Sequence, residues 1–189
     1  MKQKTIISCL LLVCFFACQT NANKQEEIQP TLPDRIQLIN EQIKIYTQEN
    51  LHRQVENQNV YFGQDSLCII PIRELISAQK FFFYFSSEAC PPCTWQIVDY
   101  IKEVFPKYEE DKEIFFVSPD WSARLRENCH GKRLLTLQKD QLGIPLEDVY
   151  VPFIFTLDED LRINTLHIVN KSDFSKTLEF LQMIKEIKQ

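Results

Sequence analysis

Two cysteines separated by two prolines, Cys90 and Cys93, stand where an apolar run ends and a helical pattern begins. The run Phe81–Phe85 before them is typical of a buried strand. We therefore expect Cys90 at or just before a helix N-terminus, where the helix dipole and free N–H groups favour a thiolate. Cys93 follows one turn later, close enough to attack a mixed disulfide on Cys90, as thiol–disulfide exchange requires. The helical pattern after the pair consists of Trp95, Ile97, Val98, Ile101, Val104 and Phe105.

A zinc half-site and a structural disulfide are the two alternatives for such a pair. Structural zinc takes four ligands, commonly a second closely spaced pair. A disulfide across so short a loop removes little entropy from the unfolded chain. The redox interpretation is therefore favoured, and we expect neither a metal nor a dissociable cofactor. The remaining candidate ligands, none of which forms a pair at ligand spacing, are Cys68, Cys129, His52, His130 and His167.

Two segments resemble the thioredoxin superfamily, in particular its exported TlpA/ResA-like thiol–disulfide oxidoreductases. Residues 81–93 are similar to the active-site strand and loop, and Val151–Asp158 is similar to the cis-proline strand that faces the cysteines. The resemblance covers roughly residues 59–188. It implies an α/β, thioredoxin-like fold: a central mixed sheet flanked by helices, here with an N-terminal helical extension. It also implies a cis Val151–Pro152 bond that lines the substrate groove and presents the Val151 backbone to an extended substrate.

The sequence departs from this family pattern close to the cysteines. Ala89 stands where the family often has Trp. Tyr84 stands where a buried carboxylate often serves as the proton-transfer partner of the second cysteine. A tyrosine, with an ordinary pKa of about 10, is a poor base near neutrality. Glu88 is the nearest substitute, so the proton-transfer partner of Cys93 stays open at this point.

The N-terminus has the pattern of an export signal. A short basic start precedes the apolar stretch 5–17, which is too short to span a membrane. Residues 15–18 resemble a bacterial lipobox, which would make Cys18 the lipidated first residue of the mature chain. The alternative is ordinary cleavage after Ala22. Either route predicts an exported protein, periplasmic or held in the bacterial envelope as an outer-membrane lipoprotein.

Three segments follow along the chain: a signal peptide at 1–17, a tether and amphipathic helix at 18–58, and the thioredoxin-like domain at 59–189. In the second segment, Asp34 is a good N-cap for a helix running towards about Asn57. We expect this helix to lie on the domain or to act as a spacer above the membrane. A dimerising coiled coil is less favoured, because the apolar stripe fades after Leu51.

The domain itself is predicted to hold a hairpin over 60–70, a strand at Ile114–Val117, a helix over Arg133–Leu142 and a strand at Leu161–Val169. A closing helix follows, capped by Ser172 or Asp173. A Cys68–Cys129 disulfide stays open, because sequence does not supply its geometry.

The predicted function is a thiol–disulfide oxidoreductase of the envelope in which Cys90 is the nucleophile and Cys93 the resolving thiol. The resemblance implies a protein disulfide as substrate and a DsbD/CcdA-like membrane protein as electron donor. We expect a reductant, because Pro91 and Pro92 have no N–H to offer a Cys90 thiolate and no basic residue lies between Glu88 and Asp99.

The alternatives are a non-catalytic binding lipoprotein with this fold and a copper metallochaperone holding the ion on its thiolates. Nucleic acid is not an expected partner, since the chain has 26 acidic against 21 basic residues and no basic cluster.

Overall fold

The computed structural model describes residues 31–62, 69–76, 80–119, 129–132, 134–137 and 142–187. The predicted signal peptide, the lipidation candidate Cys18 and Cys68 lie outside these residues. The chain divides into two units, 1–35 and 36–189. The first contributes only Thr31 and the opening turn of one helix to the described part, and the site lies wholly in the second.

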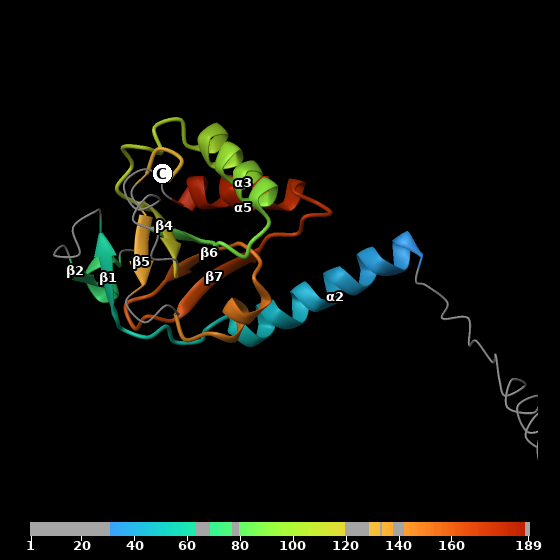
Figure 1. Ribbon diagram of the computed structural model, residues 1–189, viewed down its shortest axis with the longest axis horizontal. Helices are drawn as coiled ribbons and strands as arrows, with labels where there is room; N and C mark the ends of the chain where they lie inside the picture. The colour runs from blue at the N-terminus through green and yellow to red at the C-terminus, as the bar shows by residue number, and fades with distance from the viewer. Residues whose placement is uncertain are drawn as a thin grey trace, which may run out of the picture. The chain divides into compact units, whose positions relative to one another are not determined.

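Seven strands form one mixed sheet in the order β2-β1-β5-β4-β3-β6-β7 (Figure 1). The central strand β3 pairs parallel with β4 and antiparallel with β6, and β6 and β7 form an antiparallel hairpin. The strands are β1 Asn59–Phe62, β2 Ile69–Pro71, β3 Phe81–Tyr84, β4 Ile114–Ser118, β5 Leu134–Leu137, β6 Phe153–Leu157 and β7 Ile163–Ile168. The helices are α2 Leu32–Asn50, η1 Ile72–Leu75, α3 Pro91–Val104, η2 Pro145–Val149 and α5 Ser175–Ile187.

The connections between these elements identify the fold. Helix α3 joins the parallel pair β3 and β4, and α5 follows the antiparallel pair β6 and β7. A four-strand core in the order β4-β3-β6-β7 with these crossovers is the thioredoxin-like fold that the resemblance implies. The predicted hairpin is also present, since β1 pairs antiparallel with β2.

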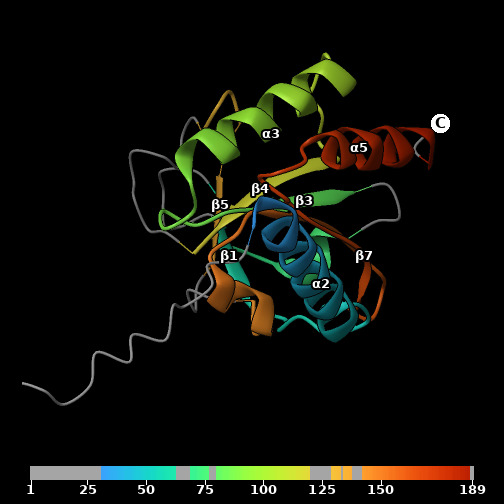
Figure 2. The same ribbon diagram turned by 90° about the vertical axis from the view of Figure 1, so that its right-hand side faces the viewer.

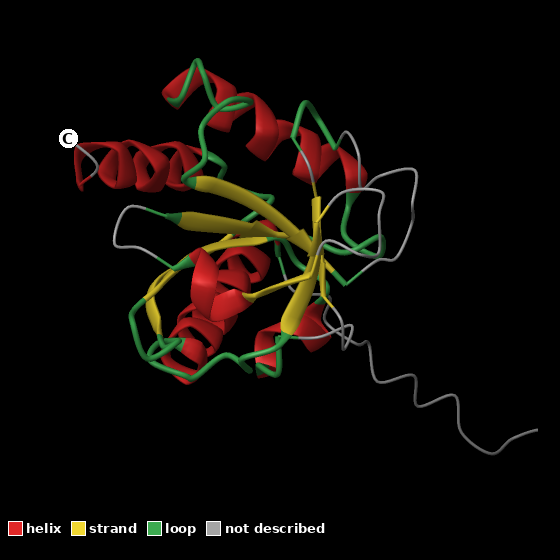
Figure 3. Cartoon of the chain, turned by 90° about the vertical axis from the view of Figure 1, so that its left-hand side faces the viewer, coloured by secondary structure: helices red, strands yellow, loops and turns green. Residues whose placement is uncertain are grey.

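The sheet has helices on both faces (Figures 2 and 3) and separates two apolar clusters of side chains. Helices α3 and α5 cover one face, and the part of α2 from Ile36 onward covers the other. Strand β3 alternates between them as a pleated strand must: Phe81 and Phe83 pack in the α3/α5 layer, and Phe82 and Tyr84 pack in the α2 layer. A strand buried on both faces explains the uninterrupted apolar run in the sequence.

The prediction of a helix over Arg133–Leu142 was wrong. Residues Leu134–Leu137 form strand β5, which pairs with β4 and β1 and is buried along its whole length. Leucine is a good helix former, but here the hydrogen bonds of two neighbouring strands and burial on both faces outweigh local propensity.

The start of helix α2 also differs from the prediction. The helix begins at Leu32, so Thr31 and not Asp34 precedes its first residue. The Thr31 N–H and hydroxyl both donate to Asp34 Oδ2, at 3.0 and 2.6 Å. Asp34 therefore satisfies a backbone donor from within the first turn, as in a capping box.

The helix ends at Asn50 instead of near Asn57. Asn50 is fully buried, and its side chain bonds both Tyr46 O (2.8 Å) and the Leu146 N–H (3.1 Å). His52 then adopts a left-handed φ of 66°, which turns the chain away from the helix. Asp173, one of the two predicted caps of the closing helix, lies two residues before its first residue Ser175, and Asp173 Oδ1 accepts from the Ser175 N–H and hydroxyl.

Candidate active site

The cysteine pair lies at the start of α3. Cys90 is the residue before the helix, and its carbonyl accepts the N–H groups of Cys93 (3.0 Å) and Thr94 (3.1 Å). Pro91 and Pro92 fill the first two helical positions, where a backbone N–H would have no partner within the helix. Cys90 is exposed, whereas Cys93 is only 7% exposed. Both are free cysteines in this structure.

The environments of the two thiols separate their acidities. Hydrogen bonds from the Cys93 thiol and then from the Cys93 backbone N–H hold the pKa of Cys90 below its ordinary value. Burial, followed by the hydrogen bond to Cys90, raises the pKa of Cys93 to about 11. Cys90 therefore loses its proton first and is the thiol that solvent and substrate can reach.

Both thiols open into a groove of about 370 Å³ whose walls come from four separate segments. Helix α2 supplies one wall, the loop before α3 carries the cysteines, the stretch from η2 to β6 supplies a third side, and the stretch after β7 closes the groove. The predicted pair Val151 and Pro152 lines it beside Cys90 and Cys93. The other lining residues are Ile39, Gln42, Ile43, Tyr46, Glu88, Val149, Tyr150, Ile168, Val169, Asn170 and Lys171.

The predicted cis bond between Val151 and Pro152 is not present, since no peptide bond in the described residues is cis. The trans form of a bond before proline is the lower in free energy by about 0.5–1 kcal/mol. Pro152 is anchored beside β7 in this form, because its carbonyl accepts the Val169 N–H at 3.0 Å. Val151 and Pro152 line the groove as predicted. The prediction that a cis bond presents the Val151 backbone to a substrate was wrong.

A buried carboxylate that the sequence did not reveal lies on the α2 side of the sheet. Glu147, in η2, is 8% exposed, and its carboxylate accepts the N–H groups of Leu142, Gly143 and Ile144 at 2.6, 2.9 and 3.2 Å. Burial raises its pKa, and these bonds together with one from Tyr84 oppose the rise.

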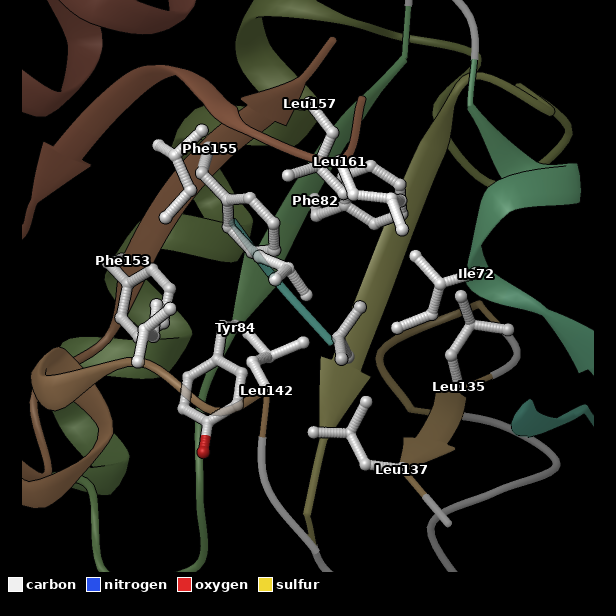
Figure 4. Close-up of a cluster of buried hydrophobic side chains, with 14 of the residues drawn as sticks. Ile72, Phe82, Tyr84, Leu135, Leu137, Leu142, Phe153, Phe155, Leu157 and Leu161 are labelled. Carbon is white, nitrogen blue, oxygen red and sulfur yellow. The ribbon is translucent and has the colours of Figure 1, made fainter. Parts of the chain in front are cut away.

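Tyr84 itself packs against Phe153 with ring centroids 4.5 Å apart, and its hydroxyl lies at the edge of the cluster (Figure 4). The position expected to hold a carboxylate thus holds a tyrosine that donates to one. A sequence signal for Glu147 was weak, because the residue three before it is Ile144 and not the Ser or Thr of a capping box.

The other candidate residues lie outside the groove. His167 is half-buried in β7, with Nε2 2.9 Å from Thr177 Oγ1 and its ring stacked on Phe180. Burial and then the Lys176 charge lower its pKa to about 4. Burial raises the pKa of the free Cys129 thiol to about 11. Within the described ranges, no three His, Cys, Asp or Glu side chains gather as metal ligands. Nor is any described helix long and apolar enough to cross a membrane.

Comparison with known proteins gives likenesses of fold. No family model matches the chain, and no curated protein does. Among solved structures, a thioredoxin-like protein from Porphyromonas gingivalis has a TM-score of 0.48 at 17% identity, covering 73% of this chain and 94% of that one.

Two further solved structures are similar in the same way. Reduced Prx3 from Vibrio vulnificus has a TM-score of 0.47 at 12% identity, and PrxQ from Xylella fastidiosa has 0.46 at 11%. Each covers 74% of this chain and 98% of its own. The fold assignment rests on the strand order given above, and the chemistry on the geometry of the cysteine pair.

Proposed function

We propose that this protein is a thiol–disulfide oxidoreductase that reduces protein disulfides through Cys90 and Cys93. One observation carries the proposal: an exposed thiol of lowered pKa accepts a hydrogen bond from a buried thiol, and both face a mainly apolar groove. A nucleophile, a resolving thiol and a surface for a polypeptide are what disulfide exchange needs.

The reaction proceeds in two exchanges. The Cys90 thiolate attacks one sulfur of the substrate disulfide; that S–S bond breaks, a mixed disulfide forms, and the released substrate thiolate takes a proton from water. Cys93 then gives its proton to the solvent and attacks the Cys90 sulfur, which releases the second substrate thiolate. The Cys90–Cys93 disulfide forms, and two electrons have moved from the protein to the substrate.

The cycle needs a dithiol reductant to restore the pair, and we propose a membrane protein similar to DsbD or CcdA in this role. The basic and apolar N-terminal pattern supports export, and Cys18 supports attachment through lipid to the envelope. The reducing direction is supported by Pro91 and Pro92, which leave the Cys93 N–H as the loop donor to a Cys90 thiolate.

Mixed-disulfide trapping tests the proposal. Cys93→Ala removes the resolving thiol, so the protein should accumulate with substrates as adducts that dithiothreitol releases. The matched control is the double variant Cys90→Ala/Cys93→Ala, which keeps every other cysteine and should form none. Adducts at equal yield in both variants, or in neither, would contradict the proposed role of Cys90 and favour a non-catalytic binding protein.

A further inference from the structure

One positively charged residue from a distant part of the sequence lines the groove that holds the cysteine pair. Lys171 follows β7, is exposed, and lines the groove together with Cys90 and Cys93. Among the described residues lining the groove, it is the only lysine or arginine, and Glu88 is the only carboxylate. No basic residue lies between Glu88 and Asp99 in the sequence, so the lysine of the groove comes from outside the loop that carries the cysteines.

The backbone around Lys171 is fixed on both sides. Two residues before it, the Val169 N–H donates to the Pro152 carbonyl at 3.0 Å. Its neighbour Asn170 is 5% exposed and donates from Nδ2 to Oδ1 of Asn40, on helix α2, at 3.1 Å. Asn170 Oδ1 accepts the Ser172 N–H at 2.9 Å. The stretch that carries Lys171 is therefore tied both to the Pro152 wall and to α2.

Charge at this place acts on both thiols in the same direction. Lys171 lowers the pKa of Cys90, after the two hydrogen bonds from Cys93, and it lowers that of Cys93 against the larger effect of burial. A cation favours a nearby thiolate, and the effect extends over about one Debye length of solvent. The other titratable groups facing Cys90 across the groove are Glu88 from its own loop, Cys93 from α3, Tyr46 from α2 and Tyr150 after η2.

We propose that Lys171 is a positioning residue for disulfide exchange: it stabilises the Cys90 thiolate from across the groove, and helix α2 holds it there through Asn40 and Asn170. This inference rests on the proposed function for its biological meaning, but the charge effect belongs to the free protein. Helix α2 thereby contributes to the chemistry as well as to the wall of the groove.

The test follows the pH dependence of Cys90 alkylation by iodoacetamide in the reduced full chain, with the label located by mass spectrometry. Lys171→Met should move the midpoint upward by about half a pH unit, and Lys171→Arg should restore it. Lys185→Met, an exposed lysine on α5 away from the groove, is the matched control and should leave the midpoint unchanged. In 1 M KCl the difference between wild type and Lys171→Met should shrink, as for a screened charge.

The anchor is tested by Asn40→Ala, which should shift the midpoint in the same direction as Lys171→Met but by less. An unchanged midpoint in Lys171→Met, or equal shifts in Lys171→Met and Lys185→Met, would overturn the role of Lys171. No effect of Asn40→Ala would overturn the role of α2. Alkylation needs no substrate, so these results are independent of whether trapping finds a protein partner.

Discussion

At the scale of single residues, the two thiols lie close together in the sequence but differ strongly in solvent exposure. Cys90 and Cys93 share one turn of helix, yet one is exposed and the other is 7% exposed. Each proline between them removes a donor that would stabilise a thiolate, and the Cys93 N–H and S–H replace those donors. The order of the cysteines at a helix start was enough to predict which thiol faces solvent.

The first prediction concerns the order of labelling. With the pKa of Cys90 lowered and that of Cys93 raised to about 11, limited alkylation of the reduced protein at pH 8 should modify Cys90 faster by about tenfold or more. Cys93 should react appreciably only as the pH approaches its own pKa. Peptide mapping after short exposures measures both rates, and faster labelling of Cys93 would reverse the assignment of nucleophile and resolving thiol.

The second prediction concerns Glu147. Glu147→Gln keeps the shape of the side chain but turns one of two accepting oxygens into a donor facing backbone N–H groups. We expect a loss of about 1–3 kcal/mol in the free energy of unfolding, measured by urea denaturation. Asp148→Asn, an exposed change in the same short helix, is the control and should cost little. An equal effect of both changes would mean that the carboxylate does not anchor this loop.

At the scale of elements, segments with a strong hydrophobic pattern could be assigned as helix or strand from the sequence, whereas a segment with a weak pattern could not. Residues around Phe81–Phe85, Ile114–Val117 and the helix after Cys93 carry continuous apolar or helical patterns, and each was predicted with the correct type. Strand β5 has only four residues, and its leucines suit a helix as well as a strand. Its conformation is decided by β1 and β4 on either side, which no local pattern contains.

The third prediction concerns the pH dependence of stability that arises from His167, which lies in β7 and contacts α5. His167 has a folded-state pKa of about 4, below the ordinary 6.5. Its contribution to stability is thus present above pH 6.5 and is lost as the pH falls towards 4, because the unfolded chain binds the proton first. This loss amounts to about 2 kcal/mol between pH 7 and pH 4.5.

Urea denaturation at the two pH values measures that loss. In His167→Gln, the loss of stability between pH 7 and pH 4.5 should be smaller than in the wild type by about the amount attributed to His167, because the titrating ring is gone. The control is His52→Asn, at an exposed residue in a left-handed turn, which should retain the wild-type pH dependence. Identical pH dependence in wild type and His167→Gln would show that this half-buried imidazole does not set the acid sensitivity of the fold.

At the scale of the whole molecule, the site is assembled from segments that the sequence keeps far apart. The cysteines and the Val151–Pro152 pair were predictable because each carries a local motif. Lys171 and the α2 wall were not, because a single lysine or an isoleucine at helical spacing has no local signature, and only the packing of α2 and the stretch after β7 brings them to Cys90. The fold class thus followed from the resemblance to a known superfamily, whereas the electrostatics of the site required the tertiary structure.

The last prediction concerns the reduction potential of the Cys90–Cys93 pair, which depends on every group that stabilises or destabilises the Cys90 thiolate. A stabilised Cys90 thiolate favours the reduced pair and makes the couple more oxidising. Lys171 and the Cys93 hydrogen bonds act in that direction, whereas the two prolines withhold donors and Glu88 adds a negative charge to the groove. Because an exposed lysine is screened by solvent, we expect the withheld donors to prevail and the pair to act as a reductant. Its potential should lie below the disulfide-isomerase value of about −180 mV.

Equilibration of the purified protein with glutathione buffers, followed by quantification of the reduced and oxidised pair, gives this potential. Lys171→Met should make it more negative, because loss of the cation destabilises the thiolate that only the reduced form contains. The Lys185→Met control should match the wild type. A wild-type potential more oxidising than about −180 mV would assign the protein to disulfide donation, and the groove chemistry around Lys171 would then outweigh the proline loop.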